Sequence, residues 1–250
     1  RTTTYKYDIM HRVTEILDPE GNVTELKYDL VGNVTSVTEP GERTTKLTYD
    51  KNYNLVSVTD PMGYVSSQSY DKNNRVVSTT NALGNSVAYE YDALGQVAKV
   101  TDASGAVVRY QYDAHGNLIK VTNPLGGETR YTYDLADHLI KVTDPMERET
   151  SYTYDSMGNL TTQEDADGKE TVYTYDLEGN LTSLTDENGS TEKMTYDMAG
   201  NLTSIVRQDS TTVTYDYDKL NHLVSKTYSE DESEVLDRYE TVGNRTSMTD

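Results

Sequence analysis

The side chains best suited to acid-base or metal chemistry are four histidines, His11, His115, His138 and His222. Imidazole transfers protons near neutral pH and binds metal ions. All four lie in or beside the turn that follows a Tyr-Asp dipeptide, at positions that are otherwise variable and polar. No GxSxG motif places a serine nucleophile and no cysteine is present. We therefore predict no catalytic residue and no cofactor site, and expect that the chain is not an enzyme.

Carboxylates form the other candidate for chemistry. In DADGKE, Asp165–Glu170, the residues Asp165, Asp167 and Gly168 match the start of an EF-hand calcium loop. That loop needs a glutamate at its twelfth position and a helix on each side. The twelfth residue here is Asp176, and the flanking residues have the pattern of strands. We interpret the segment as a solvated turn and predict no metal site, although weak Ca²⁺ binding to the acidic turns stays open.

The Tyr-Asp dipeptides set the organisation of the whole chain, because consecutive ones lie 21 residues apart. A fixed period of this kind is the mark of a repeat protein. The tyrosines are Tyr7, Tyr28, Tyr49, Tyr70, Tyr91, Tyr112, Tyr133, Tyr154, Tyr175, Tyr196 and Tyr217. The residues that we assign to the structural repeat are Tyr28, Asp29, Gly32, Tyr91, Asp92, Gly95, Tyr112, Asp113, Gly116, Tyr154, Asp155, Gly158, Tyr175, Asp176, Gly179, Tyr196, Asp197 and Gly200.

Two turns per repeat have recognisable chemistry. After each Tyr-Asp, the Asp can bond to the backbone two residues on, and a Gly three residues after it supplies the left-handed conformation that closes a hairpin with a bulge. His11, Asn74, Asp137 and Asn221 replace this Gly, and Asn, Asp and His tolerate positive φ. Tyr53 fits poorly, and we expect a strained or altered turn there. The second turn has the pattern Asp-Pro-x-Gly, as in DPEG at Asp18–Gly21, which favours a type I turn.

The residues between the turns alternate as in strands. Thr150, Tyr152 and Tyr154 would lie on one face, and Glu149, Ser151 and Thr153 on the other. Each repeat is therefore a two-stranded antiparallel unit, and eleven repeats imply on the order of twenty-two strands. Since strongly twisted open sheets rarely exceed about ten strands, we infer an all-β fold in which the repeats wind into a continuous β-spiral.

Composition fits a single-layered sheet better than a globular core. Hydrophobic residues make up 34%, and the chain has 22 Tyr but no Phe or Trp. Tyrosine is favoured where a ring has one apolar and one wet side. The net charge of −20 makes a nucleic-acid partner a poor match, because phosphate binding needs clustered cations. No apolar run approaches the roughly 20 residues of a membrane span, so we expect no membrane insertion.

The repeats keep their register along most of the chain. We predict one domain, residues 1–250, of about eleven or twelve repeats that become less regular from about residue 206. Gly41 comes one place early in its turn, and Gln68 replaces the usual Tyr or Leu. An inserted residue lies between Tyr217 and Tyr239, where YSEDESE, Tyr228–Glu234, reads as an exposed acidic loop.

The unit YDxxGNLTSVTDPxG resembles the YD or RHS repeat family, whose members include Rhs polymorphic toxins, wall-associated proteins, the C component of insecticidal toxin complexes and teneurins. The resemblance covers practically the whole chain. It implies a β-spiral that forms a hollow shell around a polypeptide, often a toxic C-terminal domain. No core-associated region, aspartyl autoprotease signature or C-terminal effector is found in the sequence.

The resemblance implies a structural module, the wall segment of a secreted or cell-surface shell that encapsulates or displays a polypeptide. Its partners would be that cargo and the remaining repeats of a larger parent protein. An adhesin or self-assembling filament subunit that binds glycan or protein through a tyrosine-lined or acidic face is the alternative, and open sheet edges favour self-association. We interpret the tyrosine columns as cross-strand ladders of stacked rings, and the alternative is a surface that binds a ligand.

Overall fold

The computed structural model describes residues 2–229 in full and the backbone of residues 234–239 and 245–249. Two compact units make up the chain. One consists of Arg1–Gln111 with Val121–Gly126, and the other of Tyr112–Lys120 with Gly127–Asp250. The same 21-residue repeat runs through both units. That the repeats form one domain over residues 1–250 stays a prediction.

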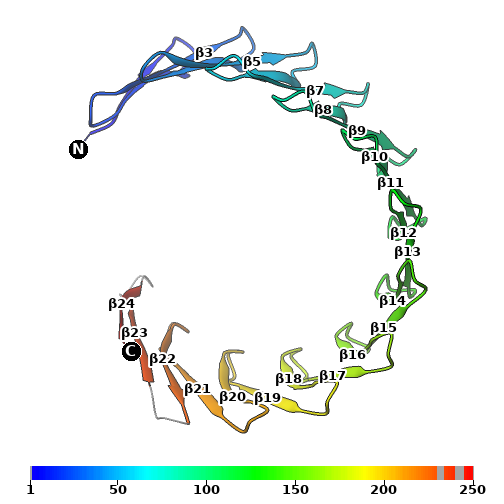
Figure 1. Cartoon of the computed structure of the whole chain (residues 1–250). Helices are drawn as coiled ribbons and strands as arrows, with labels where there is room; N and C mark the ends of the chain where they lie inside the picture. The colour runs from blue at the N-terminus through cyan, green and yellow to red at the C-terminus, as the bar shows by residue number, and fades with distance from the viewer. Residues whose placement is uncertain (1, 230–233, 240–244, 250) are drawn as a thin grey trace. The chain divides into compact units, whose positions relative to one another are not determined.

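The first unit is a run of short antiparallel strands, each paired with the next along the chain. Within this unit the strands lie side by side in one layer (Figure 1). They are β1 (Thr4–Tyr7), β2 (Val13–Leu17), β3 (Val23–Tyr28), β4 (Val34–Glu39), β5 (Arg43–Tyr49), β6 (Leu55–Thr59), β7 (Val65–Tyr70), β8 (Val76–Thr80), β9 (Ser86–Tyr91), β10 (Val97–Thr101) and β11 (Val107–Tyr112).

The second unit repeats this meander. Strand β12 (Leu118–Thr122) contributes residues to both units. The strands that follow are β13 (Glu128–Tyr133), β14 (Leu139–Thr143), β15 (Glu149–Tyr154), β16 (Leu160–Glu164), β17 (Glu170–Tyr175), β18 (Leu181–Thr185), β19 (Thr191–Tyr196), β20 (Leu202–Val206), β21 (Thr212–Tyr217), β22 (Leu223–Tyr228), β23 (Glu234–Tyr239) and β24 (Arg245–Thr249).

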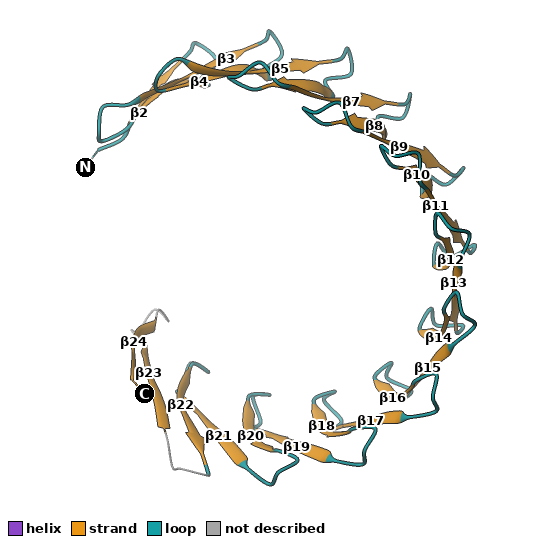
Figure 2. Cartoon of the chain, in the orientation of Figure 1, coloured by secondary structure: helices purple, strands orange, loops and turns teal. Residues whose placement is uncertain are grey.

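The predicted all-β fold of tandem two-stranded antiparallel repeats is confirmed. Strands and loops account for all of the described residues, without a helix (Figure 2), so none of them forms a helix that could cross a membrane. The strand count is 24 rather than the expected twenty-two, because β23 and β24 continue the pattern beyond Tyr217. Residues 230–233 of the predicted acidic loop, and Gly243 and Asn244, lie outside the described residues.

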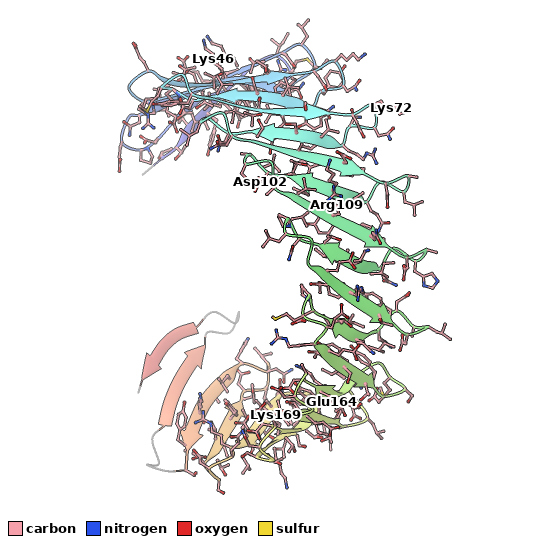
Figure 3. The ribbon with its side chains drawn as sticks, turned by 45° about the vertical axis from the view of Figure 1, so that its right-hand side comes forward. Lys46, Lys72, Asp102, Arg109, Glu164 and Lys169 are labelled. Carbon is pink, nitrogen blue, oxygen red and sulfur yellow. The ribbon has the colours of Figure 1, made fainter. Side chains whose placement is uncertain are left out.

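Two kinds of turn lie at opposite ends of the strands, and each kind forms one long side of the sheet. We call the five residues that start at the Asp of each Tyr-Asp pair a Tyr-Asp turn, and the turns that join an even-numbered strand to the next odd-numbered one Pro-type turns. In the first unit, Lys72 of a Tyr-Asp turn and Asp102 of a Pro-type turn mark these two sides (Figure 3). Both kinds share one hydrogen-bond pattern, in which the amide of the fourth turn residue donates to the carbonyl of the first.

A β-bulge follows every Tyr-Asp turn for which a register is recorded. In the pairing of β15 with β16, Thr153 lies opposite Thr162 and Tyr154 opposite Leu160, which leaves Thr161 as the extra residue. The hydroxyl of Thr161 donates to the carbonyl of Thr153 at 3.1 Å. Bulges increase the local twist and bend the bulged strand. The sequence predicted a hairpin with a bulge at this turn, but not that the extra residue of the pairing lies three positions after the Gly.

The two faces of the strands differ in chemistry. The face that we call the tyrosine face carries Tyr, Val and Leu, for example Tyr131 opposite Val142 opposite Thr150. The other, the threonine face, carries Thr, Ser and charged residues, with ion pairs such as Lys141–Glu149 at 3.0 Å. The predicted alternation over Glu149–Tyr154 is confirmed. Ser151 lies opposite Glu164 on one face of the sheet, and Tyr152 lies opposite Gln163 on the other.

No sheet or helix covers either face within a unit, and burial reflects this. Among the residues with described side chains, Val213 is the one buried apolar residue. Most tyrosines and aliphatic residues of the tyrosine face are half-buried. The structure therefore depends on contacts between neighbouring strands and turns rather than on a central core.

A test of the turn geometry uses Gly179, whose φ is +86°. The change Gly179→Val should lower the free energy of unfolding by about 1–2 kcal/mol, because a β-branched residue is strained in the left-handed region. Gly179→Asn is the matched control and should cost far less, as Asn74 already occupies this position with a φ of 61°. Urea unfolding measures both, and equal losses would contradict this account of the turn.

Candidate functional site

The Tyr-Asp turn concentrates most of the polar chemistry of each repeat. In the turn that begins at Asp155, Oδ1 accepts hydrogen bonds from the amides of Met157 at 2.8 Å and Asn159 at 2.9 Å. Oδ2 accepts one from the side chain of Asn159 at 3.0 Å. Gly158 closes the turn with a φ of +87°. One carboxylate thus satisfies three donors of a five-residue loop.

The turns assigned from the sequence share this arrangement. The amides of Asp29, Asp92, Asp113, Asp155, Asp176 and Asp197 each donate to the carbonyl of the fifth turn residue. The φ values of Gly32, Gly95, Gly116, Gly158, Gly179 and Gly200 lie between 83° and 105°. Even Tyr53 keeps the pattern, with a φ of 67° and its amide 3.1 Å from the carbonyl of Asp50. Of the two expected alternatives, the altered turn is wrong, because the hydrogen bonds of the loop are kept. The strained turn agrees with the structure, since a bulky residue is held at positive φ.

These hydrogen bonds lower the pKa values of the turn aspartates Asp155 and Asp197. The side chain and then the backbone amide of Asn159 lower the pKa of Asp155 below its ordinary value. Asn201 lowers the pKa of Asp197 in the same way. A carboxylate that accepts several hydrogen bonds is stabilised in its charged form. The Tyr-Asp aspartates therefore act as charged acceptors inside their own loops.

In four of the five turns where Gly is replaced, the residue after it changes as well, and Tyr53, which is followed by Asn54, is the exception. His11, Asn74, Asp137 and Asn221 are followed by Arg12, Arg75, His138 and His222 instead of Asn. The new side chain takes over the bond to the aspartate, as in Arg75 Nε to Asp71 at 2.7 Å and His138 Nδ1 with Asp134 at 3.0 Å. A cationic or imidazole N–H thus replaces the amide donor of Asn.

The same substitutions connect neighbouring repeats. The guanidinium of Arg75 lies 4.4 Å from the ring centre of Tyr91, and His138 stacks on Tyr154 at 4.8 Å. On the other side, Asp137 accepts hydrogen bonds from Asn117 at 2.7 Å and from His115 at 2.8 Å. These repeats therefore contact both neighbours through their turns. The sequence analysis missed the coupling, although the paired change was visible in the repeat alignment.

In eight Tyr-Asp pairs, the tyrosine hydroxyl is hydrogen-bonded to the repeat before it. The Tyr154 hydroxyl donates to the carbonyl of Leu139 at 2.8 Å. Leu139 is the first residue after the preceding turn, while the recorded pairing of β14 with β15 spans Lys141 to Thr143. The hydroxyl therefore reaches a carbonyl beyond the end of the backbone ladder. Hydrogen bonds of 2.7–3.0 Å with the same spacing of 15 residues are made by Tyr28, Tyr49, Tyr70, Tyr91, Tyr133, Tyr154, Tyr196 and Tyr217.

Comparison with known protein families places this repeat. The model of the RHS repeat matches residues 28–65, 70–107, 91–128, 112–145, 133–168, 154–191 and 196–233, which together make up most of the chain. The chain belongs to the RHS repeat family. A search of curated proteins finds no match.

Solved structures show the same fold at low sequence identity. The crystal structure of TcdB2-TccC3 without its hypervariable C-terminal region matches 98% of the chain with a TM-score of 0.56 and 16% identity. The Photorhabdus luminescens Tc holotoxin pore matches 99% with a TM-score of 0.54 and 17% identity. The RHS repeat chain spans 18% of the length of each of these matched chains. The likeness therefore concerns the fold.

The columns of tyrosine in these RHS repeats are not ladders of stacked rings. None of the eight hydroxyl-bonded tyrosines stacks on another tyrosine in the part of the chain with described side chains. The reason is spacing, because equivalent tyrosines lie two strands, or about 10 Å, apart. The residue opposite Tyr154 is Leu160, and the residue opposite Tyr152 is Gln163. The prediction of ring ladders is wrong.

Neither the histidines nor the acidic turns come together as a site. Among the described residues, no group of three His, Cys, Asp or Glu side chains is placed to hold a metal ion. Asp165 uses Oδ1 to accept the amides of Asp167 and Lys169, both at 2.9 Å, as in other turns. His115 bonds to Asp137, and this contact raises the pKa of His115. These groups serve the turns in which they lie.

The hydroxyl bond can be tested with Tyr154→Phe, which keeps the ring against His138. The free energy of unfolding should fall by about 1 kcal/mol, because the carbonyl of Leu139 loses its donor. Burial raises the pKa of Tyr154, so this stabilisation is complete below pH 10 and is lost as the pH rises through the folded pKa. The control is Tyr152→Phe in the same strand, which should cost less. Equal losses, measured by urea unfolding at pH 7, would exclude the proposed role of the hydroxyl.

A second test addresses the aspartates. Asp155→Asn should lower the Tm at pH 7 by a few degrees, because its new amide group faces the donor of Asn159. Asp60→Asn is the matched control, since Asp60 accepts only the amides of Met62 and Tyr64, and Asn81 occupies the same position one repeat later.

The pH dependence follows from the sign of the pKa shift. Because folding lowers the pKa of Asp155, its contribution is complete above the unfolded value of about 3.9 and is lost as the pH falls through the folded pKa. The Tm of the unsubstituted 250-residue chain should therefore be constant above about pH 5 and fall below about pH 4. The deficit of Asp155→Asn should shrink in acid, and a deficit independent of pH would contradict the charged-acceptor role.

Proposed function

We propose that the chain is a non-enzymatic wall segment of a larger RHS repeat shell that encloses or displays a polypeptide. The observation that carries the proposal is that the described strands of each unit form one layer with two chemically different faces, with Val213 as the one buried apolar residue among the described side chains. Such a sheet can separate two environments. The fold likeness to the TcdB2-TccC3 structures over 98% of the chain supports it. In this proposal successive repeats wind into a β-spiral.

The turns at both ends of the strands carry large exposed apolar residues. Contacts between parts of a shell wall would cover them. At the second position of the Tyr-Asp turns, Leu30 is 105% exposed, Leu135 101% and Met198 109%. The Pro-type turns expose Met62, Leu83 and Leu125 in the same manner. The apolar residues of the Tyr-Asp turns share one turn position, which lysine occupies in other repeats, and we propose that together they form an interaction surface. In a spiral of several revolutions, the turn edges of one revolution would pack on the next, and these residues would become buried.

The absence of enzymatic activity is part of the same proposal. The aspartates accept hydrogen bonds in their own turns, and three of the four histidines, His115, His138 and His222, pair with neighbouring aspartates. Each of these groups is therefore committed to a local contact. Catalysis would need an acid, a base and a nucleophile that converge on one substrate.

We further propose that the shell is secreted or displayed on a bacterial surface, in line with the toxin-complex structures that share its fold. Its partners would be a polypeptide cargo and further repeats of a longer parent protein. An adhesin or filament subunit is the second candidate. The exposed turn residues favour it, because the same apolar rows could join separate copies edge to edge.

The test places charges on one row of turn residues in the longest native parent protein. The triple change Leu30→Asp, Leu135→Asp and Leu177→Asp should abolish closed particles in electron microscopy, because a charge would be buried between revolutions. The control changes Lys51, Lys72 and Lys219, at the same turn position in other repeats, to Asp and should leave the particles intact. In the 250-residue chain alone, neither set should change the Tm by more than a degree or two, since these side chains are exposed.

Hollow particles with internal density from the parent protein would support its role as a shell wall. These particles should be lost in the triple leucine variant and kept in the triple lysine control. Fibres or open stacks from the parent would overturn it in favour of the filament. Closed particles that survive the triple change would show that the turn residues do not form the contact.

A further inference from the structure

One repeat interrupts the tyrosine face of the first unit. The position two residues before each Tyr-Asp tyrosine is Tyr in the repeats that contain Tyr89 and Tyr110, but Gln in the repeat that contains Gln68. Tyr89 is half-buried, whereas Gln68 is exposed. Gln68 lies opposite Thr79 on β8, as Tyr89 lies opposite Val100 on β10. The replacement therefore removes an aromatic ring from a surface that carries one in the following repeats.

A pocket lies where this ring is missing. It has a volume of about 260 Å³ and extends over β6 to β9, all within the first unit. Its aliphatic walls include Leu55, Val58 and Val87, and its polar residues include Ser66, Gln68 and Thr79. A cavity of about 150 Å³ lined by aliphatic groups is enough for benzene, while drug-sized ligands need roughly 300 Å³ or more. The volume suits one aromatic ring.

The polar groups of the pocket favour a ring with a hydroxyl. The hydroxyl of Tyr70 lies 3.0 Å from Gln68 Oε1 and 2.9 Å from the carbonyl of Leu55. The single proton of the Tyr70 hydroxyl is shared between these two oxygens, which leaves the N–H groups of the Gln68 amide to donate to an incoming hydroxyl. Ser66 and Thr79 add hydroxyl groups that both donate and accept. A phenol offers an apolar ring with one such polar group.

The rim of the pocket favours a ring that is attached to a polypeptide. Asn81 and Asn85 line it at the Pro-type turn. Asn81 Oδ1 accepts the amides of Leu83 and Asn85 within its own turn, so its N–H groups remain to donate outward. Main-chain carbonyls are strong acceptors for such groups. A free phenol has no group that would use this rim.

We propose that the pocket beside Gln68 binds the phenol ring of a tyrosine side chain from another polypeptide. The ring takes the place that Tyr89 and Tyr110 occupy in the following repeats, and the amides of the rim contact the main chain next to it. The site needs only the first unit. It is independent of whether the chain forms a shell wall, because the assembly of the parent plays no part in it.

The experiment titrates the 250-residue chain with N-acetyltyrosinamide and follows the methyl resonances of Leu55, Val58 and Val87 by NMR. These should shift together and saturate. Gln68→Tyr fills the pocket with a side chain of the protein and should weaken binding at least about tenfold, a difference that a titration resolves easily. Gln68→Ala leaves the pocket open but removes the amide donor, so it should weaken binding only about threefold, less than Gln68→Tyr does. Gln111→Tyr, which adds a tyrosine at an exposed position of β11, is the matched control and should bind like the parent.

Three probes separate the chemistry. N-acetylleucinamide should bind with an affinity at least about tenfold lower, measured from the same methyl resonances, since it lacks the ring and the hydroxyl. The tyrosine amide should also bind more tightly than p-cresol, and the reverse order would overturn the polypeptide as the source of the ring. Shifts that Gln68→Tyr leaves unchanged, or that spread evenly over the tyrosine faces of all repeats, would overturn the site itself. Thermal unfolding of each variant shows that it remains folded.

Discussion

The hydrogen bond from the Tyr-Asp tyrosine to a carbonyl of the previous repeat is the interaction on which the sheet depends. Each Tyr-Asp turn is followed by a bulge, and a bulge interrupts the ladder of backbone hydrogen bonds. The carbonyl at the start of the next strand, such as that of Leu139, then needs a donor. Only an aromatic residue with a hydroxyl can cover the apolar surface and supply that donor. The chain accordingly contains 22 Tyr and no Phe.

The aspartate of the same dipeptide solves the other half of the problem. A five-residue loop that closes two strands leaves amides unpaired, and one carboxylate accepts two of them as well as the side chain of the fifth residue. This explains why all eleven Tyr-Asp turns begin with Asp, whereas the Pro-type turns also accept Asn81 and Asn123. In the Pro-type turn at Asn81 only backbone amides donate to the side-chain oxygen, and an Asn oxygen suffices for these.

These local rules made the turns and the alternation of faces predictable from the sequence. The period of 21 residues, the Gly at positive φ and the Thr-Tyr alternation are all visible as residue types at fixed positions. The place of the bulge was not, because the extra residue, Thr161 or its equivalents Val56 and Ala98, has no distinctive type. The stacked tyrosine ladders were expected from spacing along the chain alone. They fail because the strand between two equivalent tyrosines keeps their rings apart.

A sheet without a core distributes its stability over contacts between adjacent repeats, as in other repeat proteins. A polar residue in one repeat therefore weakens the contacts of that repeat and leaves distant ones unchanged. This makes the tyrosine face tolerant of exceptions such as Gln68, and an exception creates a hollow whose shape is set by the intact repeats that follow it. In a globular protein the neighbouring side chains would close such a gap. Here the gap opens to the surface, where another molecule can reach it, and a repeat architecture can in this way gain a binding site by losing one side chain.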